Sequence, residues 1–241
     1  GVPVSVMGTG IGTDNVEIAL IEAHSLLAFD SERRTRLDAP PAMTVIRVGT
    51  SGGIQADIAP GTLAISSHAV GTDSTGVYFE HRCDDPLVEA MEDLATKLLR
   101  QATPTHYRFR DHLRPYASRA SGEVCGALER AARARGVEPV TGITVAVPGF
   151  YGASGRYLEG LTNTVDSIKE RFAELVVDGT RAVNMEMESS LLFHLSDALG
   201  ARAGTLCPVI SNPASQDAVV DYRPHVETAI DIACDAMLAL C

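Results

Sequence analysis

The sequence predicts an α/β protein in which the strands of one sheet alternate with helices. Short runs rich in β-branched residues, such as Met43–Val48 and Val140–Val147, have the length of buried strands. Between them, Leu87–Arg100 places apolar residues at helical spacing opposite an acidic face. The chain has 241 residues, of which 45% are hydrophobic, and this is enough to bury one large core. We therefore expect a single domain.

The most informative stretch is Met43–Gly53, where an apolar run turns into glycines and hydroxyl residues. Gly49, Gly52 and Gly53 allow the backbone to approach a ligand closely, and the N–H groups of such a turn are hydrogen-bond donors. Arg47 adds a permanent cation with a planar fork of donors, which suits phosphate. A glycine turn with a surface-paired arginine explains the same residues, and the stretch alone leaves both interpretations open.

The N-terminal stretch predicts a strand, a glycine turn and a helix. The strand is expected at Val2–Met7, the turn at Gly8–Gly12, and the helix at Asp14–Ala28 with Asp14 or Asn15 as its cap. The turn has the spacing GxGxG and not the GxGxxG of dinucleotide sites, and no acidic residue ends a second strand about 20 residues later. We therefore interpret it as a tight strand-to-helix turn that lines the same site as the Met43–Gly53 stretch.

The remaining chain continues the alternation. Asp30–Pro41 is expected to be a connection, and Gly61–Val70 a strand in which His68 is a hydrogen-bonded core or surface residue. Gln101–Ser118 lacks periodicity and is basic and aromatic, but in an acidic chain a solvated insertion or a subunit contact is favoured over RNA binding. Further elements are expected at Glu123–Gly136, Val165–Leu175, Ser189–Leu199 and Tyr222–Leu240 as helices and Ala203–Ile210 as a strand. Pro208 in that strand predicts a bulge or an edge position.

The loop Pro148–Tyr157 is a candidate pocket for a base. It follows the strand Val140–Val147 and contains glycines, two aromatic residues and Arg156. Aromatic rings stack on flat heterocycles, and arginine and hydroxyl groups hydrogen-bond with their edges. A surface loop with its aromatic rings tucked beneath it explains the same composition.

Glu186 and Glu188 stand in an apolar run that leads into the helix Ser189–Leu199. Burying carboxylates without partners is unfavourable, so a polar group must meet at least one of them. A carboxylate accepts hydrogen bonds from two adjacent hydroxyls, which is what a ribose offers through its 2′ and 3′ positions. The alternative is that one glutamate caps the following helix.

Composition narrows the classes of function. The formal net charge of −11 and the pI of about 5.0 argue against general binding to nucleic acid or to an anionic membrane. The five cysteines are far apart and form no metal-binding spacing, so we expect free thiols and no metal. No apolar run is long enough to span a bilayer, and no leader pattern precedes the first predicted strand. We expect a cytoplasmic protein.

Four motifs in the same order resemble the nucleoside phosphorylase superfamily, most closely the uridine phosphorylases. They are RVGTSGGIQADIAPGTLAISSHAV, FYGASGRY, AVNMEMESS and AGTLCPVISNP, and together they span nearly the whole chain. The resemblance implies a three-layer α/β/α fold with a central mixed sheet over residues 1–241, and a homohexamer built as a trimer of dimers. It also implies reversible phosphorolysis of a nucleoside, with inorganic phosphate as cosubstrate and no redox cofactor.

The resemblance assigns roles to phosphate and ribose ligands. Arg47 and Thr50 match the phosphate-binding arginine and threonine, with Gly49 between them in the same turn. The resemblance also implies that Thr50 lies near the ribose. Met187 and Glu188 match the residues that hold the ribose, and Glu188 matches the one that binds the ribose hydroxyls.

The base site is predicted by the same resemblance. Phe150 matches the aromatic residue that packs on the nucleoside, and Arg156 matches the arginine at the pyrimidine edge. Ser154 replaces the glutamine of uridine phosphorylases and is too short to make the same paired hydrogen bonds. Asn212 stands where purine-cleaving relatives carry an aspartic acid that protonates the base. Arg156 and Asn212 together predict a preference for uridine, and Ser154 weakens the contact with the pyrimidine.

The chain also departs from the family at its beginning. The family's first strand, its Gly-Asp-Pro phosphate turn and further basic residues would precede Gly1, and this sequence lacks them. This departure motivates one alternative, a catalytically weak nucleoside-binding homologue. The other alternative is a purine nucleoside phosphorylase or a nucleosidase of the same fold.

Overall fold

The computed structural model describes residues 4–212, 217–218 and 221–241, with 217–218 described by their backbone alone. The helices are α1 (Thr13–Ala28), α2 (Pro86–Ala102), α3 (Gly122–Ala134), α4 (Ile168–Ala173), α5 (Ser189–Ala198) and α6 (Arg223–Leu240), with short 3₁₀ turns η1 (Gly76–Tyr78) and η2 (Gly152–Ser154). The strands are β1 (Phe29–Asp30), β2 (Thr35–Arg36), β3 (Thr44–Val48), β4 (Ser51–Gly53), β5 (Leu63–Gly71), β6 (Tyr116–Arg119), β7 (Val140–Ala146), β8 (Val176–Val177), β9 (Thr180–Glu186), β10 (Arg202–Asn212) and β11 (Asp217–Ala218).

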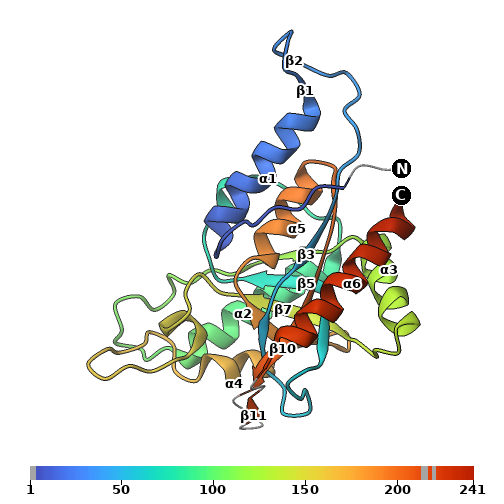
Figure 1. The fold of residues 1–241 in the computed structure, drawn as a ribbon. Coiled ribbons are helices and arrows are strands. Elements are labelled where there is room, and N and C mark those ends of the chain that lie inside the picture. Colours follow the sequence, from blue (N-terminus) through green and yellow to red (C-terminus); the bar gives the residue numbers. More distant parts are fainter. Residues whose placement is uncertain (1–3, 213–216, 219–220) are drawn as a thin grey trace.

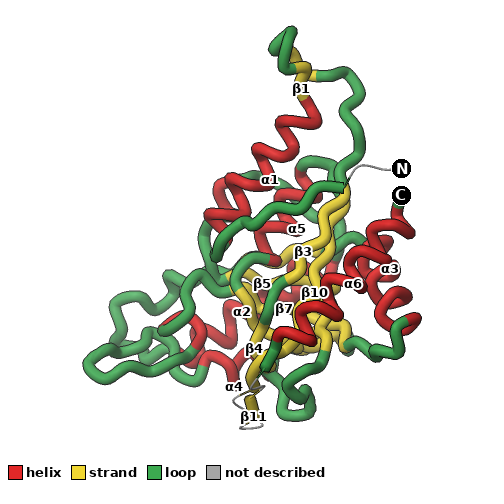
Figure 2. Tube along the Cα trace, viewed as in Figure 1, coloured by secondary structure: helices red, strands yellow, loops and turns green. Residues whose placement is uncertain are grey.

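The main sheet is mixed and lies between helices. Its strand order is β11-β10-β4-β9-β7-β5-β6, with β3 beside β10 and β8 beside β9. Helices α1 and α5 lie on one side of this sheet and α3 and α6 on the other, while α2 and α4 lie below them in the view of Figure 1. Figure 2 shows the same arrangement, with the strands running between the helices. The predicted three-layer α/β/α fold with a central mixed sheet is confirmed.

Apolar clusters hold the helices to the sheet. Leu128 of α3 and Ile232 of α6 pack with Leu206 of β10. Val16 of α1 and Phe193 of α5 belong to a separate cluster. Burying one such side chain stabilises the fold by roughly 1.5–3 kcal/mol. Because α3 and α6 pack on β10 in one cluster, and α1 and α5 pack with Ala203 of β10 in the other, the ends of these strands are held in fixed positions.

The sheet brings distant motifs together at these strand ends. β3 and β10 are parallel, with Arg47 opposite Thr205. β7 and β9 are also parallel, with Ala146 opposite Glu186, and β4 joins β10 to β9. The loops after β3, β7 and β9 therefore start close to one another.

The predicted strand Val2–Met7 is wrong over the residues that are described, which are 4–7. They join no strand, and the side chain of Val6 is 96% exposed. A strand needs a neighbour for its backbone hydrogen bonds, and among the described residues no strand pairs with residues 4–7. The cap prediction is also wrong, since Gly12 precedes α1 with φ 99° and neither Asp14 nor Asn15 caps the helix.

Several boundaries differ from the prediction for local reasons. The connection Asp30–Pro41 begins inside a small hairpin formed by β1 and β2. The helix expected at Val165–Leu175 is shortened to α4, because Ser167 has φ 51°, a left-handed conformation that an α-helix does not continue through. The loop predicted at Gln101–Ser118 gives way to β6 at its end.

The expectations for His68 and Pro208 can also be compared with the structure. His68 is buried and contacts Ser67 and Asp85, as expected of a hydrogen-bonded residue. Near Pro208, the β4–β10 register shifts between Val209 and Ser211, so the pairing is irregular where a bulge is predicted. The alternative of an edge position is wrong, because β10 pairs with strands on both sides.

Candidate active site

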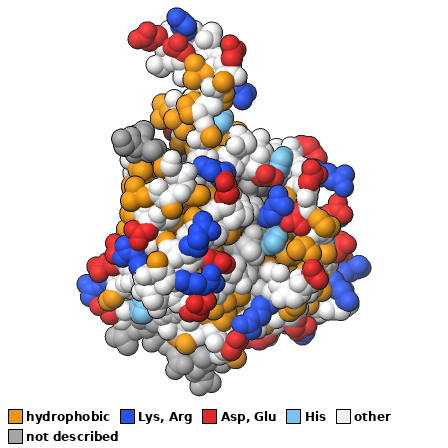
Figure 3. All heavy atoms as spheres, turned by 90° about the vertical axis from the view of Figure 1, so that its right-hand side faces the viewer, with side chains coloured by type: hydrophobic (Ala, Val, Ile, Leu, Met, Phe, Trp, Pro, Cys, Tyr) orange, Lys and Arg blue, Asp and Glu red, His pale blue; other side chains and the backbone are white. Residues whose placement is uncertain are grey.

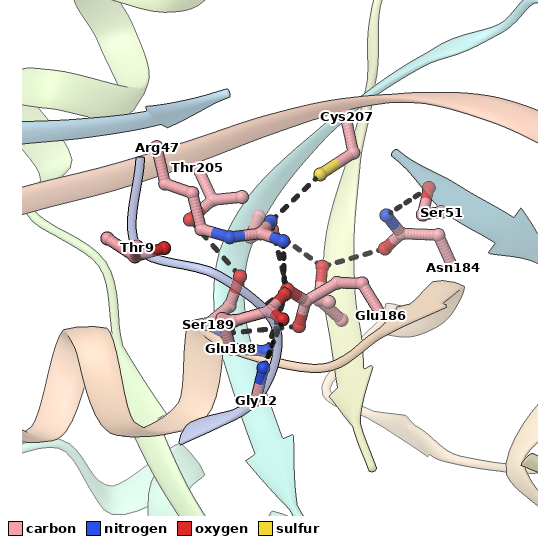
Figure 4. A network of polar contacts seen from close by, with 12 residues as sticks. Thr9, Gly12, Arg47, Ser51, Asn184, Glu186, Glu188, Ser189, Thr205 and Cys207 are labelled. Atoms are coloured by element: carbon pink, nitrogen blue, oxygen red, sulfur yellow. Dashed lines mark hydrogen bonds and ion pairs between the residues drawn. The ribbon is translucent and has the colours of Figure 1, made fainter. Parts of the chain in front are cut away.

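Arg47 is the centre of a buried polar cluster at the end of β3. Its Nη1 lies 2.9 Å from Oε2 of Glu186 and 3.2 Å from Sγ of Cys207, and its Nη2 contacts the carboxylate of Glu188. Both glutamates are buried. Figure 4 shows these side chains converging on the guanidinium from β9, the start of α5 and β10. The structure thus brings together two of the predicted ligands, Arg47 and Glu188.

The two glutamates are fixed by the start of α5. Oxygens of Glu186 accept hydrogen bonds from the backbone N–H groups of Glu188, at 3.0 Å, and Ser189, at 3.1 Å. Glu186 therefore caps the helix, the role expected for one of the pair. Oε1 of Glu188 accepts a hydrogen bond of 2.7 Å from the backbone N–H of Gly12, so the glycine turn lines the same site, as predicted.

The Arg47 guanidinium stays charged, but its two carboxylate partners offset its positive charge. Burial alone lowers the pKa of Arg47, but Glu186 and Glu188 raise it above its usual value, so the guanidinium remains protonated. Burial raises the pKa of Glu186, against the attraction of Arg47. Burial also raises the pKa of Cys207 to about 11, so its thiol is neutral at pH 7. An incoming anion must therefore compete with carboxylates for the guanidinium.

The turn after Arg47 leaves space for the guanidinium. A side chain at Gly49 would place its Cβ 2.6 Å from the guanidinium nitrogens, which is closer than van der Waals contact allows. The N–H of Gly49 donates to the carbonyl of Leu206 at 3.2 Å and so is not directed at a ligand. Thr50, the next residue, is exposed. Gly49 therefore makes room for Arg47, while Thr50 is accessible for the predicted role.

The predicted base residues form a second group on the loop after β7. The guanidinium carbon of Arg156 lies 3.8 Å from the ring centroid of Phe150, and its Nη1 donates to the carbonyl of Phe150 and to Oγ of Ser154, each at 2.5 Å. The N–H of Val147 donates to the carbonyl of Glu186 at 2.9 Å. The loop therefore leaves the sheet beside the Arg47 cluster, although among the described residues no hydrogen bond joins Arg156 to that cluster.

Two other predicted residues have different surroundings. Met187 is half-buried and packs on the apolar cluster under α2 and α4. Asn212 is fully buried, and its amide donates to the carbonyls of Gln55 and Ile58, each at 2.7 Å. Through these bonds the Asn212 amide holds the turn after β4.

Sequence reasoning missed two contacts of Arg47. Glu186 was recognised as a buried carboxylate, and its position two residues before Glu188 was the available signal, but its bond to Arg47 depends on the β3–β10–β4–β9 order. Cys207 gave no signal, because a single cysteine in a strand has no pattern. Beneath the cluster, Asn184 accepts a hydrogen bond from Thr144 at 2.7 Å and donates one to Ser51 at 2.9 Å, which ties β4 to β9 and β7.

Other sites are not indicated. Over the described residues, no group of His, Cys, Asp and Glu is arranged to hold a metal ion, and no helix has the length and apolar character to cross a membrane. A cavity of about 550 Å³ lies between α2 and residues 109–115. No predicted site residue lines it, so it is not the predicted nucleoside site.

Comparisons with known proteins find a family model and several similar proteins. A family model described as the phosphorylase superfamily matches residues 1–240. A uridine phosphorylase of Haemophilus influenzae is 30% identical, over 100% of this chain and 77% of its own length. A uridine phosphorylase of Thermococcus kodakarensis is 32% identical, over 90% of this chain and 61% of its own length.

A solved structure is similar over most of the fold. It is a Trypanosoma brucei nucleoside phosphorylase described as showing uridine phosphorylase activity, with a TM-score of 0.82 and 27% identity over 96% of this chain and 79% of its own. The match of the family model to nearly the whole chain, together with this shared fold, shows that the chain belongs to the phosphorylase superfamily.

Proposed function

We propose that this member of the superfamily, a nucleoside phosphorylase and hence a pentosyltransferase, cleaves uridine with inorganic phosphate to give uracil and ribose 1-phosphate. The observation that carries the proposal is the buried contact between Arg47 and Glu188. It places a side chain suited to bind phosphate beside a side chain suited to bind the ribose hydroxyls. The relatives named uridine phosphorylase support the same substrate class. The reaction needs no redox cofactor, because the glycosyl group is transferred without a change in oxidation state.

Substrate binding requires the Arg47–Glu188 contact to open. Phosphate oxygens take the place of the Glu188 carboxylate at the guanidinium fork, since phosphate accepts two parallel hydrogen bonds there. The released carboxylate then accepts hydrogen bonds from the ribose 2′ and 3′ hydroxyls. Glu186 keeps Arg47 in place throughout, because it is anchored by the N–H groups of Glu188 and Ser189.

The base is held by the loop after β7. As the glycosidic bond breaks, positive charge develops on the sugar and negative charge on the base. Phosphate beside the sugar and Arg156 at the edge of the base stabilise these opposite charges. Arg156 reaches the base after exchanging its present contact with the carbonyl of Phe150. Ser154 is buried and contacts Arg156, so its role in the proposal is to orient that arginine.

The acidic surroundings of Arg47 favour a contribution from a neighbouring copy. One guanidinium faces two carboxylates in this cluster, and a phosphate carries further negative charge. We propose that a neighbouring subunit of a homo-oligomer, the dimer-based hexamer implied by the resemblance, supplies additional cations. Sedimentation at the assay concentration tests this, because a fully active monomer would remove the need for a donated residue.

The experiment that tests the function is a comparison of kcat/KM for uridine, thymidine, inosine and adenosine, with saturating phosphate and without phosphate. We expect phosphate-dependent cleavage in which uridine is cleaved faster than either purine nucleoside. Inosine cleaved faster than uridine would favour the purine alternative. Cleavage that does not depend on phosphate would identify a nucleosidase, and binding without cleavage would identify a nucleoside-binding homologue.

A further inference from the structure

Cys207 is a partner of Arg47 to which the proposed reaction assigns no role. Its Sγ accepts a hydrogen bond of 3.2 Å from Nη1 of Arg47, and its side chain is fully buried on β10. β3 and β10 are parallel with Arg47 opposite Thr205. Cys207 follows Thr205 by two residues, so all three side chains lie on one face of the sheet. Figure 4 shows the sulfur directed at the guanidinium. The contact is therefore set by the register of the sheet.

The contacts of Arg47 leave one edge of its guanidinium for a ligand. Nη1 has two partners, Glu186 at 2.9 Å and Cys207. Nη2 contacts Glu188, and the proposed reaction frees it because Glu188 moves to the ribose. Nε donates no hydrogen bond to any residue that the structure describes, and it is not among the buried atoms left without a partner, so solvent reaches it. Phosphate then meets the edge formed by Nη2 and Nε, which offers two parallel donors.

The turn after β3 closes one flat face of the guanidinium. A Cβ at Gly49 would lie 2.6 Å from both Nη1 and Nη2 and 2.7 Å from Cζ of Arg47. These nearly equal distances place the Gly49 backbone over the plane of the group. A ligand does not reach this face, so the orientation of the plane decides where the Nη2–Nε edge points.

The bond to Cys207 gives the guanidinium its direction. A hydrogen bond weakens steeply when its angle falls below about 120°, whereas the attraction between charges depends on their distance. Among the described residues, the sulfur of Cys207 accepts the one hydrogen bond that Nη1 donates, while Glu186 meets Nη1 as an ion pair. β10 is paired with β3 and with β5, which fixes the position of the sulfur. Glu186 therefore holds the charge of Arg47, and Cys207 sets the angle of its plane.

The sulfur provides this contact without adding a charge. Figure 3 shows Lys and Arg side chains interspersed with Asp and Glu on the face that it presents, where water and salt screen them. The Arg47 cluster is buried, so its charges are screened less, and its two carboxylates already repel phosphate. Burial raises the pKa of Cys207 to about 11, so the thiol is neutral at pH 7. A neutral acceptor thus orients Arg47 and leaves its charge for the anion.

We propose that Cys207 is a positioning residue for phosphate, which acts by turning the Nη2–Nε edge of Arg47 towards the anion. This role rests on the proposed function, which assigns phosphate to Arg47. The hydrogen bond persists when Glu188 leaves the guanidinium, so it acts while substrate is bound. Without it the guanidinium turns about its remaining contact with Glu186, and phosphate binding weakens more than uridine binding.

The test measures phosphate and uridine binding separately in the whole chain. Cys207→Ala removes the acceptor, and Cys207→Ser replaces the thiol with a hydroxyl that accepts the same bond. Alanine and serine are of similar size, so the comparison separates the acceptor from the loss of packing. Cys125→Ala is the matched control, because Cys125 is a half-buried thiol that donates to the carbonyl of Ser66 at 3.3 Å, outside the Arg47 cluster. Thermal unfolding checks that each variant folds.

We expect Cys207→Ala to raise the dissociation constant and the KM for phosphate by about tenfold. The KM for uridine should change by less than about threefold, because the sulfur does not face the nucleoside ligands. Cys207→Ser should recover most of the phosphate affinity, and Cys125→Ala should resemble wild type. Wild-type phosphate affinity in Cys207→Ala, or an equal loss in the alanine and serine variants, would show that Cys207 only fills the core and would overturn the proposal.

Calorimetric titration with inorganic phosphate alone separates the role of Cys207 from the proposed function. A wild type that binds phosphate but does not cleave uridine would refute the function, while the variants still report the role of the sulfur in binding. A wild type that neither binds phosphate nor uses it in cleavage would overturn both.

Discussion

Replacing Arg47 by alanine should weaken both the reaction and the fold, and the structure separates the two effects. The reaction loses a bidentate, charge-assisted contact to phosphate, worth about 3 kcal/mol or more. That corresponds to about a hundredfold or more in kcat/KM. The fold loses the partner of two buried carboxylates, which typically costs about 3–5 kcal/mol. Arg47→Lys keeps the charge without the fork, so it should recover stability better than activity.

The pH dependence of the Arg47→Ala variant provides an independent check. Burial raises the pKa of Glu186 above its unfolded value, and Arg47 opposes this shift, so removing Arg47 raises the pKa further. The folded variant then holds a proton that the unfolded chain releases. Its stability is therefore greatest below the unfolded pKa of glutamate and falls as the pH rises towards the folded pKa. The loss of stability relative to wild type should be smaller at acid pH.

The assays are steady-state kinetics with phosphate varied and denaturant unfolding at several pH values. Arg181→Ala is the matched control, because Arg181 forms an exposed ion pair with Asp57 and should change stability by less than about 1 kcal/mol. An Arg47→Ala variant with wild-type phosphate affinity and turnover would refute the assignment of this turn. A variant with a constant stability deficit across the pH range would refute the electrostatic account of Glu186.

Four further outcomes are expected. Gly49→Ala should lower kcat/KM by about tenfold or more, with a smaller effect on thermal stability, because the new Cβ displaces the active-site guanidinium. Cys207, whose pKa burial raises to about 11, should resist iodoacetamide at pH 8 while exposed Cys234 reacts, as peptide mass spectrometry will show. Arg156→Ala should slow uridine cleavage without changing the KM for phosphate, and unchanged cleavage would remove Arg156 from the base site. Asn212→Asp should destabilise the fold by about 1–3 kcal/mol in denaturant unfolding without creating purine cleavage, because a carboxylate cannot donate to the two carbonyls that the amide holds.

The sequence predicted the parts of the fold that depend on local patterns. The strand β3 and the amphipathic helix α2 both appear close to the predicted boundaries, although β3 is half-buried along its whole length and not fully buried as its apolar run predicts. The N-terminal strand was wrong, because apolar composition cannot show whether a pairing partner exists for residues 4–7. The hairpin of β1 and β2 was missed for a related reason, since its turn depends on the Asp30 side chain and not on alternating apolar residues.

The residues of the candidate site could be predicted where a charged residue interrupts an apolar run of the sequence. Arg47 and Glu188 were identified in this way, and the structure places them in contact. The partner role of Glu186 and the approach of Cys207 follow from the order of strands in the sheet, which no short stretch of sequence encodes. Asn212 was assigned by its position in a motif, but its orientation is set by the carbonyls of the turn after β4.

The hydrogen bond from Gly12 to Glu188 joins positions that are 176 residues apart in the sequence. We expect this contact to close when α1 docks on α5, since α1 carries the Gly12 turn at its start and Glu188 stands at the start of α5. A chain that has formed β3 and β10 but has not docked the start of α1 would lack one of the groups that orient Glu188. Recovery of catalysis during refolding should therefore follow this docking step, so that enzymatic activity reports the completed native state.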